Sequence, residues 1–397
     1  MTVGREHKSD NENEETLSEL SVSAVNTPSQ ETQKCLNEKQ RENENMSIDS
    51  GSTVYAQMIA LRDRQRKLRA ESPFVIRGAQ LPWETNPQGI MKWYLHPAVE
   101  RSCHKALIFS VQKIPARSRS GKQHCQGGVV HYVAQGRGKT VINEVAHEWE
   151  AGDIVQLPLL PEGVTYQHFN DDSSGEAVLT ACLPNLSEPL GIDRGAGLFQ
   201  IEAAPEFTGA FRSELSDLTA LRAKLQAESG KAIEVKVDAP QSTYDRNYAR
   251  TQEIQQRSRT AKIVVRRDDR REEMTRQGRL RYYLNRTVLH DTVLKDWNVF
   301  THELRTRSGK HRHQGGLAIY VIDGKGYTVV EGQRLDWESS DLILLPIQPG
   351  GVEHQHFNLN GEAPSFWMAY IYKPFHDEVA HGMEQREESP EFKGSGN

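Results

Sequence analysis

A long internal repeat constrains this chain more than any other feature of its sequence. Residues 120–170 align without a gap to residues 308–358, and roughly half of the aligned positions are identical. Self-similarity of this kind indicates a duplicated unit, in which two copies of one fold follow each other along the chain. A weaker match extends each unit upstream, because KWYLHP from position 92 is similar to RYYLNR from position 281.

Within each unit the residues predict β-structure. Short β-branched and aromatic runs such as YVIDGKGYTVV, DLILLPI and FWMAYIY are separated by Gly, Pro and Asp, without a long helical periodicity. This pattern favours an all-β fold of tandem barrels or sandwiches. Between the units, SELSDLTALRAKLQAES has apolar residues at helical spacing and ends near Gly230, so we expect a connecting helix.

Composition separates the folded units from solvated segments. Residues 1–52 are rich in Glu, Asn, Ser and Gln and poor in aromatic residues, so we expect a disordered tail. We place a first barrel at 53–208, a helical linker at 209–241, a second barrel at 242–378 and a flexible tail at 379–397. One hypothesis is that translation natively starts at Met46, which mass spectrometry of the native protein would test.

Charge and cysteine content argue against several classes of partner. The formal net charge is -5 and the two signs are mixed along the chain, so we expect no nucleic-acid partner. The chain has neither an apolar run long enough to cross a membrane nor a signal-peptide pattern, so we expect a cytoplasmic protein without a membrane partner. Four cysteines without a CxxC pair indicate reduced thiols. Exposed barrel faces favour a homo-oligomer.

The second unit contains a set of candidate metal ligands. His311 and His313 lie two residues apart, which places both imidazoles on the same face of a strand. His354 lies on another strand, which a closed barrel could bring beside the first pair. Three neutral imidazoles suit a divalent metal such as Fe(II), Mn, Ni, Cu or Zn. His356 shares a strand face with His354 and is a candidate catalytic residue, acting as a base or as a donor that orients oxygen or substrate.

These motifs resemble those of the cupin superfamily, whose members are small antiparallel jelly-roll barrels with one metal inside. The resemblance rests on the His311/His313 pair and on the pattern formed by Pro349, Gly351, His354 and Asn358. The duplication then corresponds to a bicupin, an all-β protein of two tandem cupin (double-stranded β-helix) barrels joined by a helical linker.

One departure from the usual cupin motif narrows the resemblance. Most cupins have a Glu four or five residues after the second His, but Leu317 and Ala318 occupy those positions. Gentisate 1,2-dioxygenase-type ring-cleaving enzymes are similar to this sequence in lacking that Glu and holding Fe(II) with three His. The resemblance implies a non-haem Fe(II) dioxygenase that cleaves or oxygenates a gentisate-like hydroxylated aromatic acid with O2, at a metal held by His311, His313 and His354.

Two other functions stay open. One is another metal-dependent bicupin enzyme, an oxygenase, decarboxylase or isomerase that uses Mn, Ni or Zn, although such relatives usually retain the motif Glu. The other is a cupin that binds a small ligand without catalysis. A cation near the metal would favour an anionic substrate. We interpret the three nearby candidates, Arg305, Arg307 and Arg312, as surface charges.

The first unit lacks the candidate ligands. Gln123, Cys125 and Tyr166 occupy the positions of the three histidines, and His124 lies one residue out of phase, so its side chain is expected to point away. We therefore interpret the first unit as a degenerate barrel that binds no metal. Some polar residues persist in both units, and the simplest interpretation is that they are structural; they are Gln126/Gln314, Gln167/Gln355, His168/His356 and Asn170/Asn358.

Overall fold

The computed structural model describes residues 53–232, 235, 242–379 and 382–394. The expected disordered tail, the proposed start at Met46 and part of the expected linker lie outside the described residues. The chain divides into two units, Met1–Asp63 and Arg64–Asn397. The described part of the first unit is the beginning of helix α2, Val54–Glu71, and everything below concerns the second unit.

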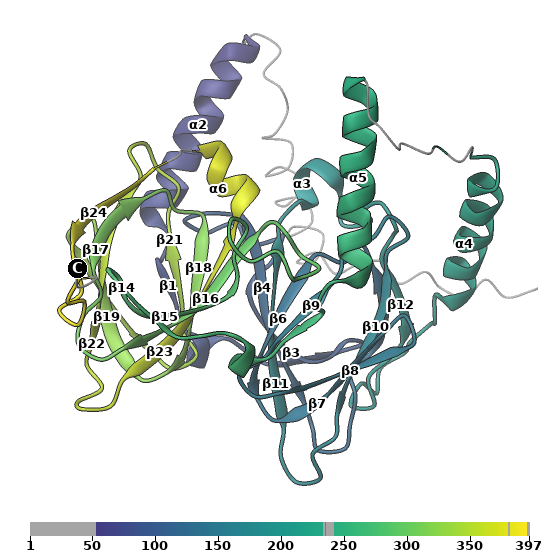
Figure 1. The fold of residues 1–397 in the computed structure, drawn as a ribbon, viewed down its shortest axis with the longest axis horizontal. Coiled ribbons are helices and arrows are strands. Elements are labelled where there is room, and N and C mark those ends of the chain that lie inside the picture. Colours follow the sequence, from purple (N-terminus) through teal and green to yellow (C-terminus); the bar gives the residue numbers. More distant parts are fainter. Residues whose placement is uncertain (1–52, 233–234, 236–241, 380–381, 395–397) are drawn as a thin grey trace, which may run out of the picture. The chain divides into compact units, whose positions relative to one another are not determined.

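The first repeat forms a barrel of two antiparallel sheets. One sheet has seven strands in the order β13-β9-β6-β11-β4-β3-β2 and the other has five in the order β12-β5-β10-β7-β8 (Figure 1). Their bounds are β2 Glu84–Asn86, β3 Gly89–Leu95, β4 Leu107–Ile114, β5 Lys122–Cys125, β6 Val129–Gln135, β7 Arg137–Ile142, β8 Val145–Glu150, β9 Ile154–Leu157, β10 Val164–Asn170, β11 Ala177–Pro184, β12 Phe199–Glu202 and β13 Val264–Val265.

The second repeat forms a matching barrel. Its seven-stranded sheet has the order β1-β21-β18-β23-β16-β15-β14, and its five-stranded sheet has the order β20-β19-β22-β17-β24. Their bounds are β1 Val75–Ile76, β14 Glu273–Thr275, β15 Gly278–Leu284, β16 Trp297–Leu304, β17 Lys310–His313, β18 Leu317–Asp323, β19 Lys325–Val330, β20 Gln333–Glu338, β21 Leu342–Leu345, β22 Val352–Asn358, β23 Ser365–Tyr372 and β24 Met383–Glu387.

The described residues contain few helices, and these lie outside the repeated segments 120–170 and 308–358. The expected connecting helix is α4, Leu215–Ser229, and a second polar helix, α5 (Thr243–Thr260), begins with a capping box between Ser242 and Asp245. None of the described helices is long and apolar enough to cross a membrane. The remaining helical turns are α3 Ser187–Leu190, α6 Lys373–Val379, η1 Gly78–Gln80 and η2 Arg267–Asp269.

The two barrels exchange short edge strands. Strand β1, which precedes the first barrel in sequence, pairs with β21 of the second, and β13, which precedes the second barrel, pairs with β9 of the first. The exchange corrects the expected boundaries, because residues 75–76 belong to the sheet of the second barrel and residues 264–265 to that of the first. A two-residue strand carries no periodicity, so the sequence pattern could not assign it.

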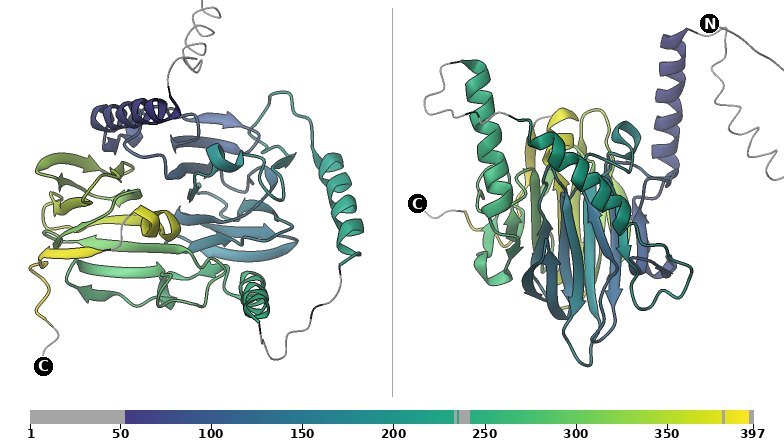
Figure 2. Two further views of the ribbon diagram at one scale, coloured as in Figure 1. Left: turned by 90° about the horizontal axis from the view of Figure 1, so that it is seen from above. Right: turned by 90° about the vertical axis from the view of Figure 1, so that its right-hand side faces the viewer.

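Side chains seal the contact between the barrels. One hydrophobic cluster combines Phe109 and Cys182 of the first barrel with Tyr320 and Tyr370 of the second. The Phe109 and Tyr370 rings meet edge to face, with centroids 5.5 Å apart. From above, the strands of the two barrels lie side by side (Figure 2). The shared core makes the pair of barrels one packed body.

The C-terminal segment contradicts one expectation. Residues 379–397 were expected to form a flexible tail, but Met383–Glu387 form β24, which pairs with β17 beside the candidate ligands. Its side chains are mostly exposed and polar. The strand is therefore held mainly by backbone hydrogen bonds. Because these require no alternation of apolar and polar residues, the sequence pattern did not indicate a strand here.

The persistent polar residues form the same hydrogen bonds in both barrels. Gln167 donates to the Ser120 carbonyl (2.8 Å) and Gln355 donates to the Ser308 carbonyl (2.9 Å). The backbone N–H of His168 and of His356 each donates to the hydroxyl of the same serine, at 2.9 Å in both cases. These bonds connect the loop before β5 to β10 in the first barrel and the loop before β17 to β22 in the second. The interpretation of Gln167/Gln355 and His168/His356 as structural agrees with these contacts.

Candidate metal centre

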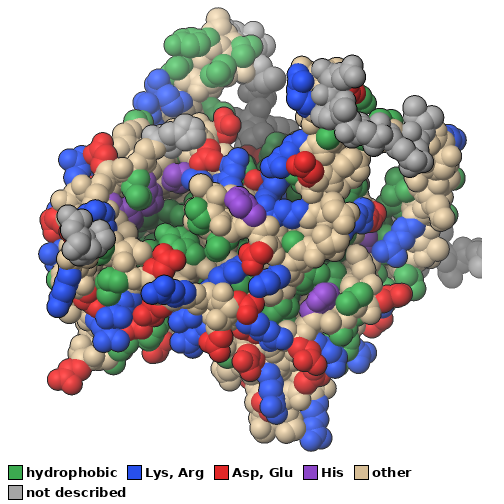
Figure 3. Space-filling view, viewed as in Figure 1, with side chains coloured by type: hydrophobic (Ala, Val, Ile, Leu, Met, Phe, Trp, Pro, Cys, Tyr) green, Lys and Arg blue, Asp and Glu red, His purple; other side chains and the backbone are tan. Residues whose placement is uncertain are grey.

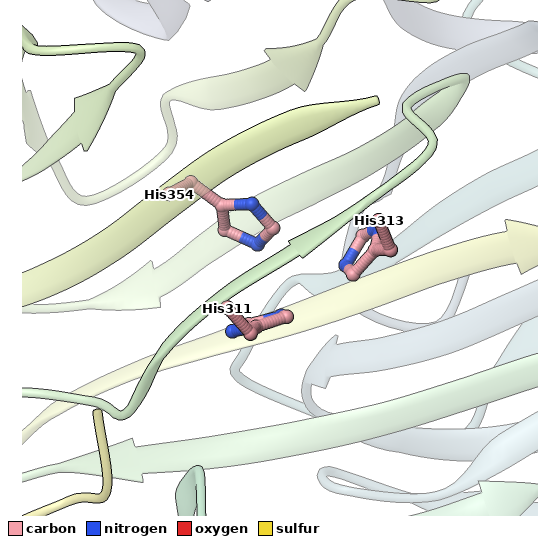
Figure 4. A group of neighbouring side chains, drawn as sticks. All are labelled: His311, His313 and His354. Atoms are coloured by element: carbon pink, nitrogen blue, oxygen red, sulfur yellow. The ribbon is translucent and has the colours of Figure 1, made fainter. Parts of the chain in front are cut away.

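Two neighbouring strands bring three histidines together in the second barrel. His311 and His313 project from β17, and His354 projects from β22, where it lies directly opposite His311 in the antiparallel register. The three side chains converge (Figure 4), and one nitrogen from each lies within 4.8 Å of the others. This is the only group of three or more potential ligands, counting His, Cys, Asp and Glu, among the residues that the structure describes.

Backbone contacts orient two of the rings. The Nδ1–H of His313 donates to the Gln314 carbonyl at 2.7 Å, and the Nδ1–H of His354 donates to the Val352 carbonyl at 3.2 Å. Each ring then offers the lone pair of Nε2. The Nδ1 atom of His311 is buried without a hydrogen-bond partner among the described residues.

Burial keeps the three imidazoles neutral. It lowers the pKa of His311 to about 3 and that of His313 to about 4, and it holds the pKa of His354 well below its usual value. The neighbouring histidines lower the pKa values of His311 and His354 further. Neutral imidazoles are the form that binds metal, so the donor set fits a divalent ion.

No carboxylate joins the cluster within the described part of the chain. Leu317 lines the cavity beside the histidines and Ala318 is fully buried in the core, so neither position supplies a charge. Asp377 is the one acidic side chain that lines this cavity among the described residues. It is paired with Lys373 (2.8 Å) and Arg286 (2.7 Å). The candidate centre is therefore a three-histidine site.

A buried chain of hydrogen bonds contacts His356. The indole N–H of Trp337 donates to the Thr328 hydroxyl at 2.9 Å, and that hydroxyl lies 2.8 Å from His356 Nδ1. The Thr328 hydroxyl can accept from the indole and donate its own proton to Nδ1, and in that arrangement Nε2 of His356 carries the ring proton. Burial lowers the pKa of His356 well below its usual value. Of the two roles considered for this residue, the relay favours a donor.

The histidines open into a cavity of about 390 Å³ inside the barrel. Aromatic and aliphatic side chains form much of its wall, including Tyr282, Phe300, Trp367 and Ile371. In the space-filling view, histidine and hydrophobic side chains gather around a hollow over this barrel (Figure 3). Walls of this kind suit an organic ligand with an apolar body.

The cation in this cavity is one that the sequence pattern missed. Arg312 pairs with Glu331 on the barrel surface, and neither Arg305 nor Arg307 lines the cavity. Instead Lys373, at the start of α6, lines it and is the only Lys or Arg that does so in the described chain. His376 follows one turn later, with its ring centroid 5.8 Å from that of His313. The signal available in the sequence was a Lys directly after the FWMAYIY run, with a His three residues later.

The first barrel replaces the ligands with a hydrogen-bonded pair. The Tyr166 hydroxyl donates to Gln123 Oε1 at 2.6 Å, and Gln123 Nε2 donates to Gln200 at 2.7 Å. The ring of His124, one residue out of phase, lies 3.0 Å from the Thr165 hydroxyl. Within the described residues this barrel has no cluster of three potential metal ligands.

Comparison with known proteins finds likeness in structure only. No family model matches the sequence, and neither does any curated protein. Oxalate decarboxylase from Bacillus subtilis at pH 4.6 is 12% identical, with 79% of this chain and 78% of that chain covered and a TM-score of 0.51. A second structure of that enzyme, concerned with its Mn(II) centres, is 12% identical over 79% of both chains, with a TM-score of 0.50.

A third solved structure, vicilin from Corylus avellana (hazelnut), is 11% identical, with 80% of this chain and 88% of that chain covered and a TM-score of 0.50. At such identities the likeness concerns the fold, because one fold supports many chemistries. The all-β architecture expected from the repeat is confirmed. The chain has the bicupin fold, two tandem cupin barrels, and the second of them holds the three-histidine cluster.

Proposed function

We propose that the second barrel is the active site of a metal-dependent enzyme that acts on a small organic acid. The observation that carries this proposal is the convergence of three neutral imidazoles on a cavity with apolar walls, which is also lined by Lys373 and its ion-pair partner Asp377. Convergent ligands on rigid strands, an enclosed cavity and a charged group inside it are the usual components of a catalytic pocket.

The donor set is compatible with several divalent ions. We propose Fe(II), with Mn as an equal candidate in view of the Mn(II) centres of the structural neighbour, and Ni or Zn as further possibilities. A divalent ion held by three neutral ligands would keep its full charge and supply Lewis acidity toward an anionic bidentate oxygen ligand. His311, His313 and His354 would hold it.

The residues around the cluster favour a hydroxylated aromatic acid as the substrate, with O2 as the second substrate. Tyr282, Phe300 and Trp367 offer an aromatic wall for a ring. Lys373, which is paired with Asp377 in this structure, would also contact the carboxylate, and with Thr328 donating to Nδ1 the Nε2–H of His356 would donate a hydrogen bond to an oxygen of the bound acid. Apolar walls would favour burial of the ring. A gentisate-like acid has these groups.

A second candidate is the decarboxylation of a small dicarboxylic acid. The likeness of the fold to oxalate decarboxylase favours it. The walls count against it, because a dicarboxylate as small as oxalate has no apolar body to fill a cavity of about 390 Å³. A site for such a dianion would also be expected to contain more cations than Lys373 alone.

The experiment combines metal analysis with two product assays. Protein purified without oxygen is analysed for bound metal, with His354→Ala as the control for adventitious binding. The loaded protein is then mixed with gentisate and related hydroxybenzoic acids in an oxygen electrode, and separately with oxalate while CO2 is measured.

Each outcome separates the candidates. About one metal ion per chain, absent from His354→Ala, with O2 uptake on a hydroxybenzoic acid, is the expected result. CO2 release from oxalate without O2 uptake would move the assignment to a decarboxylase. No retained metal, even after reconstitution, would overturn the enzyme proposal and favour a ligand-binding protein.

A further inference from the structure

The first barrel also contains a cavity, although it lacks the histidine ligands. The cavity has a volume of about 280 Å³, and its walls are mainly apolar, including Met91, Ile108, Leu179, Ala181 and Leu183. A barrel retained only for packing would be expected to fill its interior with side chains, because empty volume destabilises a core. The cavity therefore suggests that the first barrel has a role besides packing.

The wall at the former ligand positions is polar but uncharged. Tyr166 and Gln123 satisfy each other, and Gln123 continues to Gln200, so these groups form a closed chain of neutral hydrogen bonds. His131 also lines the cavity. Its Nδ1–H donates to the Thr180 carbonyl at 3.1 Å, and burial lowers the pKa of His131 to about 4, so this ring is neutral.

Arg194 is the one charged side chain that lines this cavity among the described residues. It lies half-buried on the loop after α3, and no acidic residue lines the cavity or pairs with it in the described part of the chain. Cys125, which occupies the position of His313, lines the same cavity; burial raises its pKa to about 11, so this thiol is neutral. Among the described residues, the cavity is therefore lined by one cation and by no acidic side chain that could pair with it.

We infer that the first barrel binds a small monocarboxylic acid with an apolar body, whose carboxylate pairs with Arg194 and whose body fills the cavity between Met91, Leu179 and Ala181. The bidentate geometry of a guanidinium suits one carboxylate. Among the described residues, this cavity is lined by no second cation and by no cluster of metal ligands, which distinguishes its occupant from a chelating acid. The inference concerns a site separate from the metal centre and does not depend on its activity.

The repeat supplies a matched pair of blocking substitutions for the test. Ala181 on β11 and Ala369 on β23 occupy equivalent positions, and each lines the cavity of its own barrel. Ala369→Leu therefore narrows the second cavity from its wall and leaves the lining of the first unchanged. Isothermal titration of this full-length variant uses benzoate as the probe and benzamide as its uncharged isostere.

We expect the Ala369→Leu protein to bind one benzoate per chain at least about tenfold more tightly than benzamide, since only benzoate forms the charged pair. Adding Arg194→Gln should remove this preference while benzamide binding persists. Adding Ala181→Leu instead should abolish binding of both probes. Thermal unfolding of each variant checks that the fold is kept.

Three results would overturn the inference. The first is that Ala369→Leu alone abolishes benzoate binding seen in the parent protein, which would place all binding in the second barrel. The second is an unchanged preference for benzoate after Arg194→Gln. The third is that the folded parent and Ala369→Leu proteins both fail to bind benzoate.

Discussion

The two barrels share one framework and differ in what their cavities can bind. In both, a buried Trp donates to a Thr hydroxyl that contacts a His: Trp149, Thr140 and His168 in the first, with Trp337, Thr328 and His356 in the second. The framework is therefore independent of the metal. The barrels differ at the three ligand positions, where the second has metal donors and the first has neutral side chains, two of which are hydrogen-bonded to each other. The same fold can therefore be kept with or without a metal site.

The largest expected effect comes from substituting equivalent ligand positions in the two barrels. We expect His354→Ala to abolish metal retention and activity, because two imidazoles on one strand leave an incomplete donor set. Tyr166→Phe at the equivalent position of the first barrel should change neither. Elemental analysis after dialysis measures both variants, and a loss of metal from Tyr166→Phe would show that the first barrel takes part in the site.

The second prediction concerns the buried relays. Thr140→Val and Thr328→Val each leave a buried indole N–H without its acceptor, so each should lower the free energy of unfolding by about 1–3 kcal/mol. Only Thr328→Val should also lower kcat, because only His356 faces the proposed substrate. Thr328→Ser should restore kcat.

Urea unfolding and steady-state kinetics measure the two effects separately. If Thr328→Val destabilised the protein without changing kcat, the hydroxyl would have no positioning role. Equal kinetic effects of the two valine variants would point to a general loss of structure.

The third prediction concerns the cation of the second cavity. Lys373→Met should raise KM for a carboxylate substrate about tenfold and change kcat little. The reason is that the ion pair between Lys373 and the carboxylate would be present equally in the bound substrate and in the transition state. Lys373→Arg should recover part of the loss. Lys122→Met in the first barrel removes a surface pair with Glu202 and serves as the control. An unchanged KM for Lys373→Met would mean that the acid is oriented by another group.

The smallest expected effect concerns the strand exchange. The buried Asp341 accepts from Arg77 (2.7 Å), and Asp153 accepts from Arg266 (2.8 Å), on the opposite side of the exchange. Arg77→Ala and Arg266→Ala should each lower the free energy of unfolding by about 1 kcal/mol, since backbone N–H donors to each carboxylate remain. The double variant should show the sum in urea unfolding. A loss in only one variant would show that the two contacts are not equivalent.

The candidate site was largely accessible from the sequence, whereas its surroundings were not. Strand parity placed His311 and His313 on one face, and the repeat identified Gln123, Cys125 and Tyr166 as their unlike counterparts. The cation of the cavity was missed, because Lys373 reaches it from α6, a short helix without a recognisable pattern. Arg312 lies closer in sequence to the histidines but faces outward by the same parity that brings them together.

By itself, the sequence determined the duplication, the all-β character and the position of His311 and His313 on one strand face, because local periodicity and repetition are encoded along the chain. The pairing of β17 with β22 then brought His354 beside them. Only the tertiary structure decided the exchange of β1 and β13, the pairing of β24 and the cavity that holds Arg194. Backbone hydrogen bonds between distant segments make the strand pairings, and closure of the barrel creates the cavity. Neither depends on a local pattern of residue types.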